Sequence, residues 1–306
     1  MQGNTGKLSA WLQLIRLPNL LTVPGDPLAG YFLAATCCGA GFSLTVVYTV
    51  LASLFFYTFG LISNDLFDLR EDRQDRPGRP LPSGRITPLE VSAVAIILVI
   101  VALITAAMTG RLCLLIAGIL VFTITLYNFI GKKIAVFGPL NMGLCRGLSL
   151  LLGASAVGMA GITCSTVLFA VVLLTVYIAA VTFIAAKETV QQNLGSKRWW
   201  PVFSIFLFLV PLCWSRDVIS HTLSAKVFSG CLIAAALFWS WKGGDLLAGT
   251  PAPGVVPAVI GRFIQGLLLV QAMLLSLCNW PAQIAAGMLI LIFPVFSILA
   301  RRFYSS

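Results

Sequence analysis

Long runs without a charged residue dominate the chain, and short polar segments separate them. Residues 91–110 and 112–131 form two such runs, and the runs at 147–186 and 263–300 are each long enough for two helices. A helix needs about 20 mostly apolar residues to cross the hydrocarbon core of a bilayer. The pattern therefore predicts an all-α polytopic bundle of ten transmembrane helices, at 20–40, 44–63, 90–110, 112–130, 136–158, 164–186, 200–215, 226–241, 262–278 and 282–300.

The composition agrees with an integral membrane protein. Hydrophobic residues make up 59% of the 306 positions, charged residues make up only 10%, and the mean hydropathy is +0.98. Soluble domains carry about 25% charged residues, and disordered chains combine low hydrophobicity with high net charge. These values exclude an ordinary soluble enzyme, a disordered tail and a fibrous protein, and they indicate one integral domain over residues 1–306.

The basic residues are distributed unequally between the two ends of the predicted helices. Sixteen of the 20 Lys and Arg residues lie on the side that holds both termini and the loops after the second, fourth, sixth and eighth helices. Cytoplasmic loops carry such an excess of positive charge, which also attracts anionic lipid. We therefore expect a multi-pass protein of the plasma (inner) membrane with both termini in the cytoplasm, membrane lipid as a partner, and no nucleic acid.

The loop after the second predicted helix concentrates acidic residues. Residues 63–85 hold five of the ten Asp and Glu residues, and Asp65, Asp68 and Asp72 have the i, i+3, i+7 spacing of one helical face. Carboxylates that converge repel one another unless a cation lies between them, and their oxygens suit an Mg²⁺ ion shared with substrate phosphates. The arginines that follow can neutralise the same phosphates, and the prolines from Pro77 onward end the helix.

A solvated loop of mixed charge is the alternative interpretation of this segment. Two features favour a binding site. The acidic residues lie on one face directly after an apolar helix, with Asn64 at its end, and residues 79–85 read Arg-Pro-Leu-Pro-Ser-Gly-Arg.

These residues resemble a known family motif. Asn64-Asp65-xx-Asp68-xxx-Asp72, followed by the sequence at 79–84, is similar to the first aspartate-rich motif of the UbiA superfamily of membrane prenyltransferases. The resemblance extends over most of the chain. Arg16 and Asn19 resemble the Arg and Asn that open the first helix of the family, and Tyr127 and Lys132 resemble its Tyr-xxxx-Lys element.

The resemblance implies a fold and an activity. The fold is a bundle of helices, usually nine, around a central prenyl-binding cavity. The activity is transfer of an isoprenyl group, an alkyl group other than methyl, from a prenyl diphosphate to a hydrophobic, usually aromatic acceptor, with Mg²⁺ between the diphosphate and two aspartate motifs. It implies catalytic, metal-binding roles for Asp65, Asp68 and Asp72. Diphosphate- or prenyl-binding roles are implied for Asn64, Arg16, Asn19, Arg79, Tyr127 and Lys132.

The second aspartate motif departs from the family pattern. It should follow the sixth helix, where this chain has Lys187, Glu188 and Gln192 before a Gly-Ser-Lys sequence. The Asp-xxx-Asp ligands are therefore replaced by Glu188, which keeps a carboxylate and stays a predicted metal ligand, and by the neutral Gln192. We expect Lys187 and Glu188 to bind diphosphate. The altered motif and the tenth helix resemble the EboC-like branch of the superfamily.

Two ionisable residues within the predicted helices are further candidates, because charge inside a membrane is usually functional. They are Asp26 in the first helix and Arg146 in the fifth. For Asp26, pairing within the bundle is the alternative to a pocket role. Arg146 is predicted to bind diphosphate or the prenyl group, although the small residues around it also suit simple helix packing.

Two functions remain open at this level. The intact first motif favours a prenyltransferase, whereas the Glu188/Gln192 pair favours a non-catalytic descendant that binds or transports a lipid or hydrophobic metabolite. An unrelated transporter is a third alternative, but it would predict internal repeats with broken helices, and the sequence shows no repeat.

Overall fold

A computed structural model describes residues 2–186, 193–214, 223–252 and 254–303. The described residues form helices and connecting turns, and ten longer helices correspond in order to the ten predicted segments. These are α3 (Gly25–Cys38), α4 (Thr45–Phe67), α6 (Pro88–Thr109), α7 (Arg111–Phe129), α8 (Phe137–Ala154), α10 (Ser165–Ala185), α11 (Trp200–Trp214), α12 (Leu223–Leu246), α13 (Val255–Ser276) and α14 (Ala282–Phe303).

Eight of these helices are long and apolar enough to cross a membrane, and α3 and α11 are shorter, with 14 and 15 residues. The chain is therefore a multi-pass integral membrane protein. Short elements complete the described fold: α1 (Gln2–Leu14), α2 (Leu17–Leu20), α5 (Leu69–Asp75), α9 (Met159–Thr163), η1 (Gly131–Lys133), η2 (Ser155–Val157) and η3 (Gly195–Trp199).

The first predicted helix, at 20–40, is not continuous. The chain forms α2, turns through residues 21–24, and begins α3 at Gly25. Pro24 and Pro27 lack the backbone N–H that a helix interior requires, and Pro18 lies in the first turn of the short α2. The helix predicted at 20–40 therefore begins after this break, at Gly25, and ends at Cys38.

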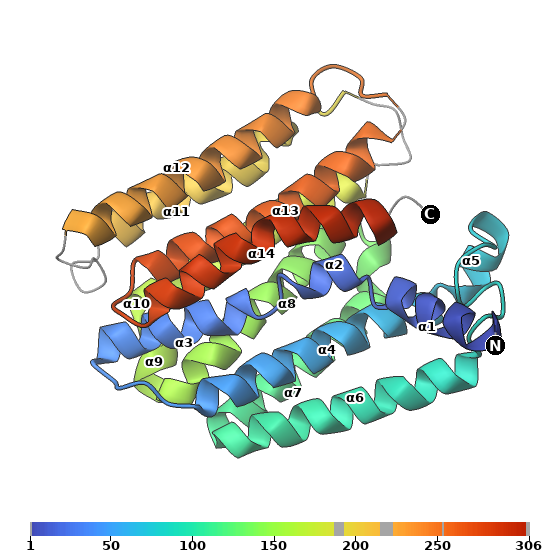
Figure 1. Cartoon of the computed structure of the whole chain (residues 1–306), viewed down its shortest axis with the longest axis horizontal. Helices are drawn as coiled ribbons and strands as arrows, with labels where there is room; N and C mark the ends of the chain where they lie inside the picture. Colours follow the sequence, from blue (N-terminus) through green and yellow to red (C-terminus); the bar gives the residue numbers. More distant parts are fainter. Residues whose placement is uncertain (1, 187–192, 215–222, 253, 304–306) are drawn as a thin grey trace.

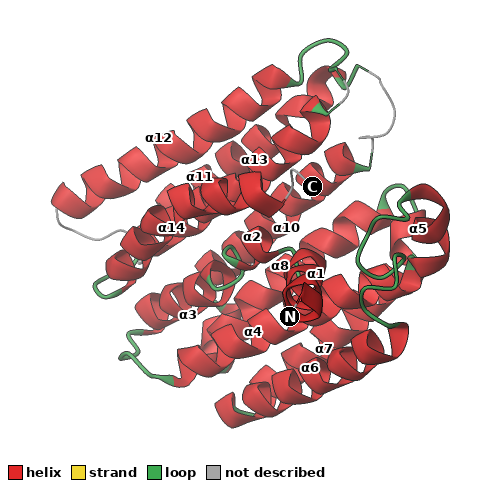
Figure 2. Ribbon diagram, turned by 45° about the vertical axis from the view of Figure 1, so that its right-hand side comes forward, coloured by secondary structure: helices red, strands yellow, loops and turns green. Residues whose placement is uncertain are grey.

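The long helices run side by side as one bundle, with α11 and α12 paired along one edge and α6 at the opposite edge (Figures 1 and 2). α1, α5 and the end of α14 lie at the same end of the bundle, at the right of Figure 1. The helix α13 is the most buried candidate span, with 72% of its most apolar window inside the protein, whereas α6 has 22%. The core is therefore built around α13, and α6 faces the membrane.

Close contact between α3 and α8 depends on glycine. A Cβ atom on Gly30 would lie 1.9 Å from the backbone oxygen of Leu150, and one on Gly153 would lie 1.9 Å from that of Pro27. Small residues allow membrane helices to approach in this way. The helices α2 and α3 together form the first membrane segment, in two parts. The contact brings this two-part first segment against α8, which carries Arg146.

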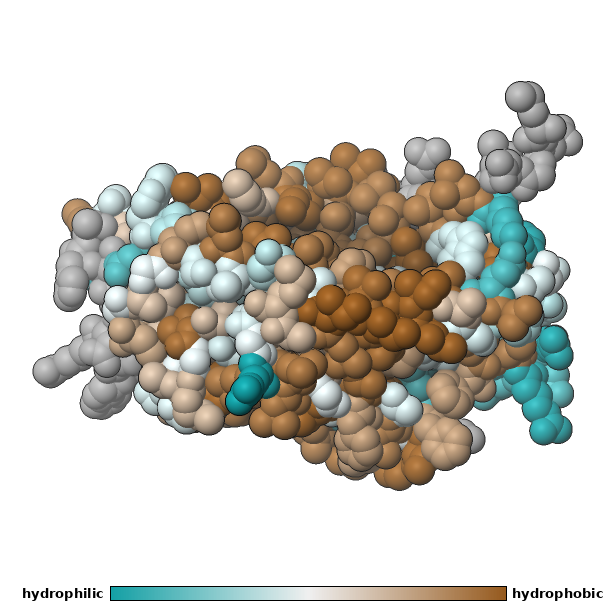
Figure 3. Space-filling view, turned by 90° about the horizontal axis from the view of Figure 1, so that it is seen from below, coloured by the Kyte–Doolittle hydropathy of each residue, from teal (hydrophilic) through white to brown (hydrophobic). Residues whose placement is uncertain are grey.

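The outer surface is apolar through the middle of the bundle. Figure 3 shows a brown, hydrophobic central region and hydrophilic residues gathered at the right-hand end, which is the end that holds α5 in Figure 1. Exposed apolar side chains on the membrane-facing side of α6 include Ile96, Ile97, Ile100, Ile104 and Met108. This surface is suited to lipid rather than to water.

The acidic segment continues the helical path of α4. The Asp68 N–H donates to the Asn64 oxygen, and the Asp72 N–H donates to the Asp68 oxygen, so the helical hydrogen-bond spacing continues from α4 into α5. The helix α5 ends at Asp75, before Pro77, as the sequence predicts.

Candidate active site

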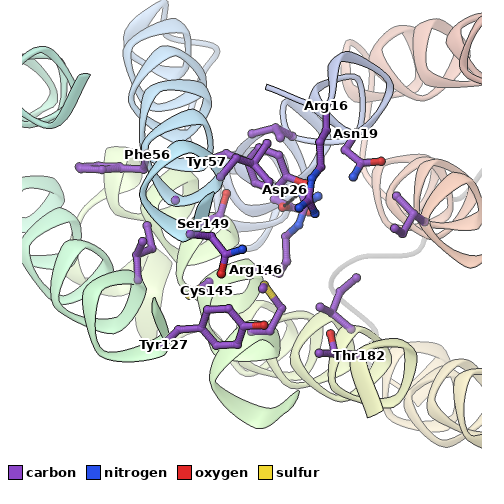
Figure 4. A pocket seen from close by; sticks show the side chains of 18 of the residues that line it. Arg16, Asn19, Asp26, Phe56, Tyr57, Tyr127, Cys145, Arg146, Ser149 and Thr182 are labelled. Carbon is purple, nitrogen blue, oxygen red and sulfur yellow. Dashed lines mark hydrogen bonds and ion pairs between the residues drawn. The ribbon is translucent and has the colours of Figure 1, made fainter. Parts of the chain in front are cut away.

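A cavity of about 370 Å³ lies among the two-part first segment and α4, α7, α8, α10 and α13. Its apolar walls come from every one of these helices. Its polar lining residues are Arg16, Asn19, Asp26, Ser53, Tyr57, Asn64, Tyr127, Asn128, Arg146, Ser149 and Thr182. Figure 4 shows that Arg16 and Asn19 approach the cavity from one side and Tyr127 from the other. A volume of this size is typical of small-molecule sites.

Arg16, which lines the cavity, forms an ion pair with Asp65. The Arg16 Nη2 atom lies 3.6 Å from Asp65 Oδ1. Arg16 has a φ angle of 46°, a left-handed conformation that is uncommon for a residue with a side chain, and it immediately precedes α2. Asp65 is buried, and its Oδ1 atom has no hydrogen-bond partner. A buried acceptor without a donor is costly, so this oxygen is ready to accept a further ligand.

Asn64, Asp68 and Lys132 form the second group. The Asn64 side-chain amide donates to Asp68 Oδ2 at 3.1 Å, and Lys132 forms an ion pair with Asp68 Oδ1. The Lys132 Nζ atom also lies 3.4 Å from Asn64 Oδ1. Asn64 lines the cavity, so this group joins the end of α4 to the η1 turn beside the cavity.

Asp72 and Arg79 form the third pair. The Arg79 Nη1 atom donates to Asp72 Oδ2 at 2.7 Å. Asp72 is buried, and Arg79 lies in the proline-rich segment that follows α5. The ion pair therefore folds this segment back over the acidic residues.

A different polar cluster lies among the helices, where Arg146 meets Asp26. The Arg146 Nη1 atom donates to Asp26 Oδ2 at 2.7 Å, and Nη2 donates to Thr22 Oγ1 at 2.7 Å. The Gln271 Nε2 atom, on α13, donates to Asp26 Oδ1 at 2.6 Å. The Arg146 guanidinium also lies over the Tyr57 ring, 4.8 Å from its centre. Figure 4 shows Arg146 reaching Asp26 at the edge of the cavity.

The comparison with known proteins identifies this architecture. The model of the UbiA prenyltransferase family matches residues 27–242. The chain belongs to the UbiA prenyltransferase family. Among curated UbiA relatives, it is similar to digeranylgeranylglyceryl phosphate synthase from Methanococcus vannielii, with 32% identity over 152 residues, which are 49% of this chain and 54% of that protein. The chain thus spans about half the length of the curated relatives it matches.

Solved structures share the UbiA fold across more of the chain. A structure of digeranylgeranylglyceryl phosphate synthase has a TM-score of 0.62 at 22% identity and covers 89% of this chain and 98% of its own. A UbiA homologue from Archaeoglobus fulgidus, bound to DMAPP and Mg²⁺, has a TM-score of 0.54 at 18% identity and covers 86% and 99%. At these identities, the likeness shows the fold: the helical membrane bundle predicted from the sequence is confirmed.

The UbiA bundle brings most of the predicted residues into the cavity lining or beside it. Arg16, Asn19, Asn64, Tyr127 and Arg146 line the cavity itself. The residues Asp65, Asp68, Asp72, Arg79 and Lys132 belong to the three ion pairs beside it. Lys187, Glu188 and Gln192 lie outside the described residues.

The three aspartates differ from the predicted arrangement in one respect. Within the described part of the chain, no three His, Cys, Asp or Glu side chains gather closely enough to hold a metal ion together. Asp65, Asp68 and Asp72 instead each lie against a different basic side chain. Like charges repel, and a basic neighbour for each carboxylate lowers that energy. Convergence of the three carboxylates on one point is therefore not what the structure shows.

Sequence reasoning missed several polar residues of the UbiA cavity. Ser53 and Ser149 form a hydrogen bond of 2.6 Å between α4 and α8, and Asn128 donates to the backbone oxygen of Gly60 at 3.2 Å. Gln271 was missed as well, although an amide within an apolar run of helical length is itself a signal of a buried polar contact.

Proposed function

We propose that this UbiA-family protein is a membrane prenyltransferase. It transfers an isoprenyl group from a prenyl diphosphate to a hydrophobic acceptor and requires Mg²⁺. One observation carries the proposal: three acid–base pairs lie beside an apolar cavity, to which they are joined by Arg16, a member of one pair, and by Asn64, which donates to Asp68. The pairs suit a charged diphosphate, and the apolar walls suit a prenyl chain.

The donors beside the cavity fit Mg²⁺. Carboxylate oxygens are ligands that Mg²⁺ prefers, and it is commonly shared between one or two carboxylates and substrate phosphates. Asp65 Oδ1 is buried without a hydrogen-bond partner, and Asp68 lies at the next turn of the same helical path. We propose Asp65, Asp68 and Asp72 as the residues that would hold Mg²⁺, with one or two carboxylates to an ion, since the three do not converge on one point. When bound, Mg²⁺ supplies positive charge that stabilises the departing diphosphate.

The basic residues supply the remaining electrostatic stabilisation. Among the described residues, Arg16, Lys132 and Arg79 each pair with one of the three carboxylates. With the carboxylates holding Mg²⁺, these basic side chains would be able to donate to diphosphate oxygens. Hydrogen-bond donors that are already oriented stabilise the negative charge that develops on the leaving diphosphate.

The cavity walls would protect the reactive prenyl group from water. Apolar side chains from six parts of the fold, including Phe56 and Ile264, surround the cavity. An allylic cation reacts readily with water, so an apolar enclosure favours transfer to the acceptor. The Tyr127 ring lies at the cavity wall, and the face of an aromatic ring attracts cations.

Two classes of acceptor are candidates. The sequence resemblance implies an aromatic acceptor, whereas the names of the curated relatives describe synthesis of digeranylgeranylglyceryl phosphate. We therefore propose a hydrophobic acceptor and include both chemical classes in the test. Glu188 remains the proposed carboxylate of a weakened second motif, with Lys187 as a diphosphate-binding neighbour. The proposed location is the plasma (inner) membrane, with both termini and α5 on the cytoplasmic side.

The test is a transfer assay with the purified full-length protein in liposomes. Geranyl, farnesyl and geranylgeranyl diphosphate are each combined with an aromatic acid and with a prenylglyceryl phosphate, with Mg²⁺ or with EDTA. Product that forms only with Mg²⁺ supports the proposal. Tight binding of prenyl diphosphate without product from any pair would instead support a non-catalytic binding or transport protein.

A further inference from the structure

The break between α2 and α3 leaves a backbone oxygen without its helical donor. In a continuous helix the Asp26 N–H would donate to the Thr22 oxygen, but here it donates to the Val23 oxygen at 3.3 Å. Lipid offers such a freed carbonyl no donor, so groups from neighbouring parts of the fold must satisfy it. The residues that do so show what maintains the break.

Two side chains from distant helices satisfy the freed carbonyl. Gln271 Nε2 donates to the Thr22 oxygen at 2.7 Å, and Arg146 Nη1 lies 3.4 Å from it. Arg146 Nη2 also donates to the Thr22 hydroxyl, which itself donates to the Asn19 oxygen at 2.8 Å. The polar cluster is therefore attached to the broken segment, and its contacts extend back to Asn19 in α2.

The charged groups of the cluster are already paired with protein groups, although the buried Gln271 Oε1 atom has no hydrogen-bond partner. Asp26 accepts from Arg146 on one oxygen and from Gln271 on the other, and both Nη atoms of Arg146 donate to the protein. Asp26, Thr22 and Gln271 have no exposed surface, and Arg146 is 7% exposed. A diphosphate that reached Arg146 would have to break these contacts. The geometry therefore favours a role for Arg146 in fixing the backbone around Thr22 rather than in binding diphosphate.

The polar cluster fixes the chain from Asn19 to Asp26, and the residues just before this segment belong to the predicted diphosphate site. Arg16 immediately precedes α2, adopts its left-handed conformation there, and pairs with Asp65. A strained backbone of this kind persists only where the surrounding structure holds it. We propose that Arg146, together with Asp26 and Gln271, is a positioning residue that fixes the α2–α3 break and thereby places Arg16 against Asp65 for diphosphate binding. This inference rests on the proposed function for its last step.

A variant that removes both charges of the buried ion pair can test the positioning role without leaving an unpaired charge. Replacing both members of such a pair is often neutral for stability, whereas removing one leaves a buried unpaired charge. The double variant Asp26→Asn/Arg146→Met removes both charges at similar side-chain sizes. The matched control is Ser53→Ala/Ser149→Ala, because it removes another buried polar pair of the same cavity that does not contact the break.

The first readout does not depend on catalysis or on any ligand. Hydrogen–deuterium exchange of the peptide 16–24 should rise by about tenfold in Asp26→Asn/Arg146→Met, as expected for loss of charge-assisted hydrogen bonds. The peptide should exchange at the wild-type rate in the serine control. Unchanged exchange in the Asp26/Arg146 variant would overturn the proposal, even if that variant is stable and correctly folded.

The second readout separates positioning from direct contact and from general damage. The Asp26/Arg146 variant should bind geranyl diphosphate with Mg²⁺ about tenfold more weakly, while its affinity for geraniol stays within about threefold of wild type. In a protein that already carries Arg16→Gln, the Asp26/Arg146 substitutions should cause almost no further loss of affinity for geranyl diphosphate. Fully additive losses would indicate direct contact, and equal losses for both ligands would indicate general damage; either result overturns positioning through Arg16.

The same measurements distinguish the two proposals. If the wild-type protein binds geranyl diphosphate no more tightly than geraniol, the proposed function fails. The exchange result then still decides whether Arg146 and Asp26 hold the break. If wild type prefers the diphosphate and the exchange of 16–24 is unchanged in the double variant, only the positioning proposal fails.

Discussion

Lys132, in the turn after α7, forms an ion pair with Asp68, at the end of α4, although 64 positions separate them in the chain. The pair joins the two sequence elements that most resemble the UbiA family. Asn64 contacts both residues and lines the cavity, so the contact links the acidic segment to the apolar interior. The following predictions test this arrangement and the fold that produces it.

The first prediction compares two aspartates of the same segment. Asp68→Asn should weaken Mg²⁺-dependent geranyl diphosphate binding by about tenfold or more, because it removes charge from the pair with Lys132 and from the proposed metal site. Asp75→Asn, at an exposed position at the end of α5, should change the affinity by less than about threefold. Isothermal titration of both variants measures this. Equal losses would indicate a general charge effect.

The second prediction concerns the arginine of the proline-rich segment. Arg79→Gln removes the partner of buried Asp72 and should weaken diphosphate binding by about tenfold. Arg70→Gln is the matched control, since Arg70 is an exposed residue of α5, and its affinity should match wild type. Similar losses in both variants would show that net positive charge, rather than the Asp72 contact, determines affinity.

The third prediction addresses the weakened second motif. Gln192→Asp restores the family's second carboxylate and should increase affinity for Mg²⁺ and geranyl diphosphate, or increase turnover, by several-fold. Asn193→Asp adds the same charge one position later and keeps an acceptor for the Gly195 N–H, so it should not have this effect. Glu188→Gln should abolish whatever activity the second motif supports. An unchanged Mg²⁺ titration in Gln192→Asp would contradict the prediction.

The fourth prediction concerns topology. A reporter fused after Arg302 and one inserted at 110–111, between α6 and α7, should indicate opposite sides of the membrane, with the former cytoplasmic. The end of α14 and α5 lie at the same end of the bundle in Figure 1, so a tag within 76–79 should agree with the C-terminal reporter. Signals on the same side from the first two reporters would exclude ten crossings.

The fifth prediction concerns the contact between α3 and α8. Gly153→Ala should lower the free energy of unfolding by about 1–3 kcal/mol, because the new Cβ would lie 1.9 Å from the Pro27 oxygen. Gly118→Ala is the control: nothing lies within 4 Å of its added Cβ, and alanine favours a helix. Thermal unfolding in detergent should therefore show a lower Tm only for the first variant. A Tm for Gly153→Ala at or above that of Gly118→Ala would contradict the close approach.

The helix order could be predicted from the sequence because the length of an apolar run directly reflects the thickness of a bilayer. The tenth helix, α14, appears where the pattern places it, after the Asn-Trp-Pro sequence at 279–281. The break at 21–24 was not predicted, because membrane helices tolerate proline when other groups bind the freed carbonyl. Those groups, on Arg146 and Gln271, are 124 and 249 positions away from Thr22.

The site was predictable in its residue types but not in its pairings. The spacing of Asp65, Asp68 and Asp72 indicated a shared helical path, which the backbone hydrogen bonds support. Which basic side chain meets which carboxylate depends on how distant helices pack, so Lys132 could not be assigned to Asp68 from spacing alone. For Asp26, the alternative of pairing within the bundle matches the structure, with Arg146 as its partner.

The most direct test of the proposed function is the Mg²⁺ dependence of prenyl transfer by the purified protein in liposomes. Radiolabelled geranylgeranyl diphosphate is incubated with the acceptor panel, and lipid-soluble product is measured for wild type and Asp68→Asn. We predict product from the wild type that disappears with EDTA and returns with added Mg²⁺, and at least about tenfold less product from Asp68→Asn. Product formation that is unaffected by EDTA and by Asp68→Asn, or no product and no Mg²⁺-dependent diphosphate binding, would contradict the proposed function.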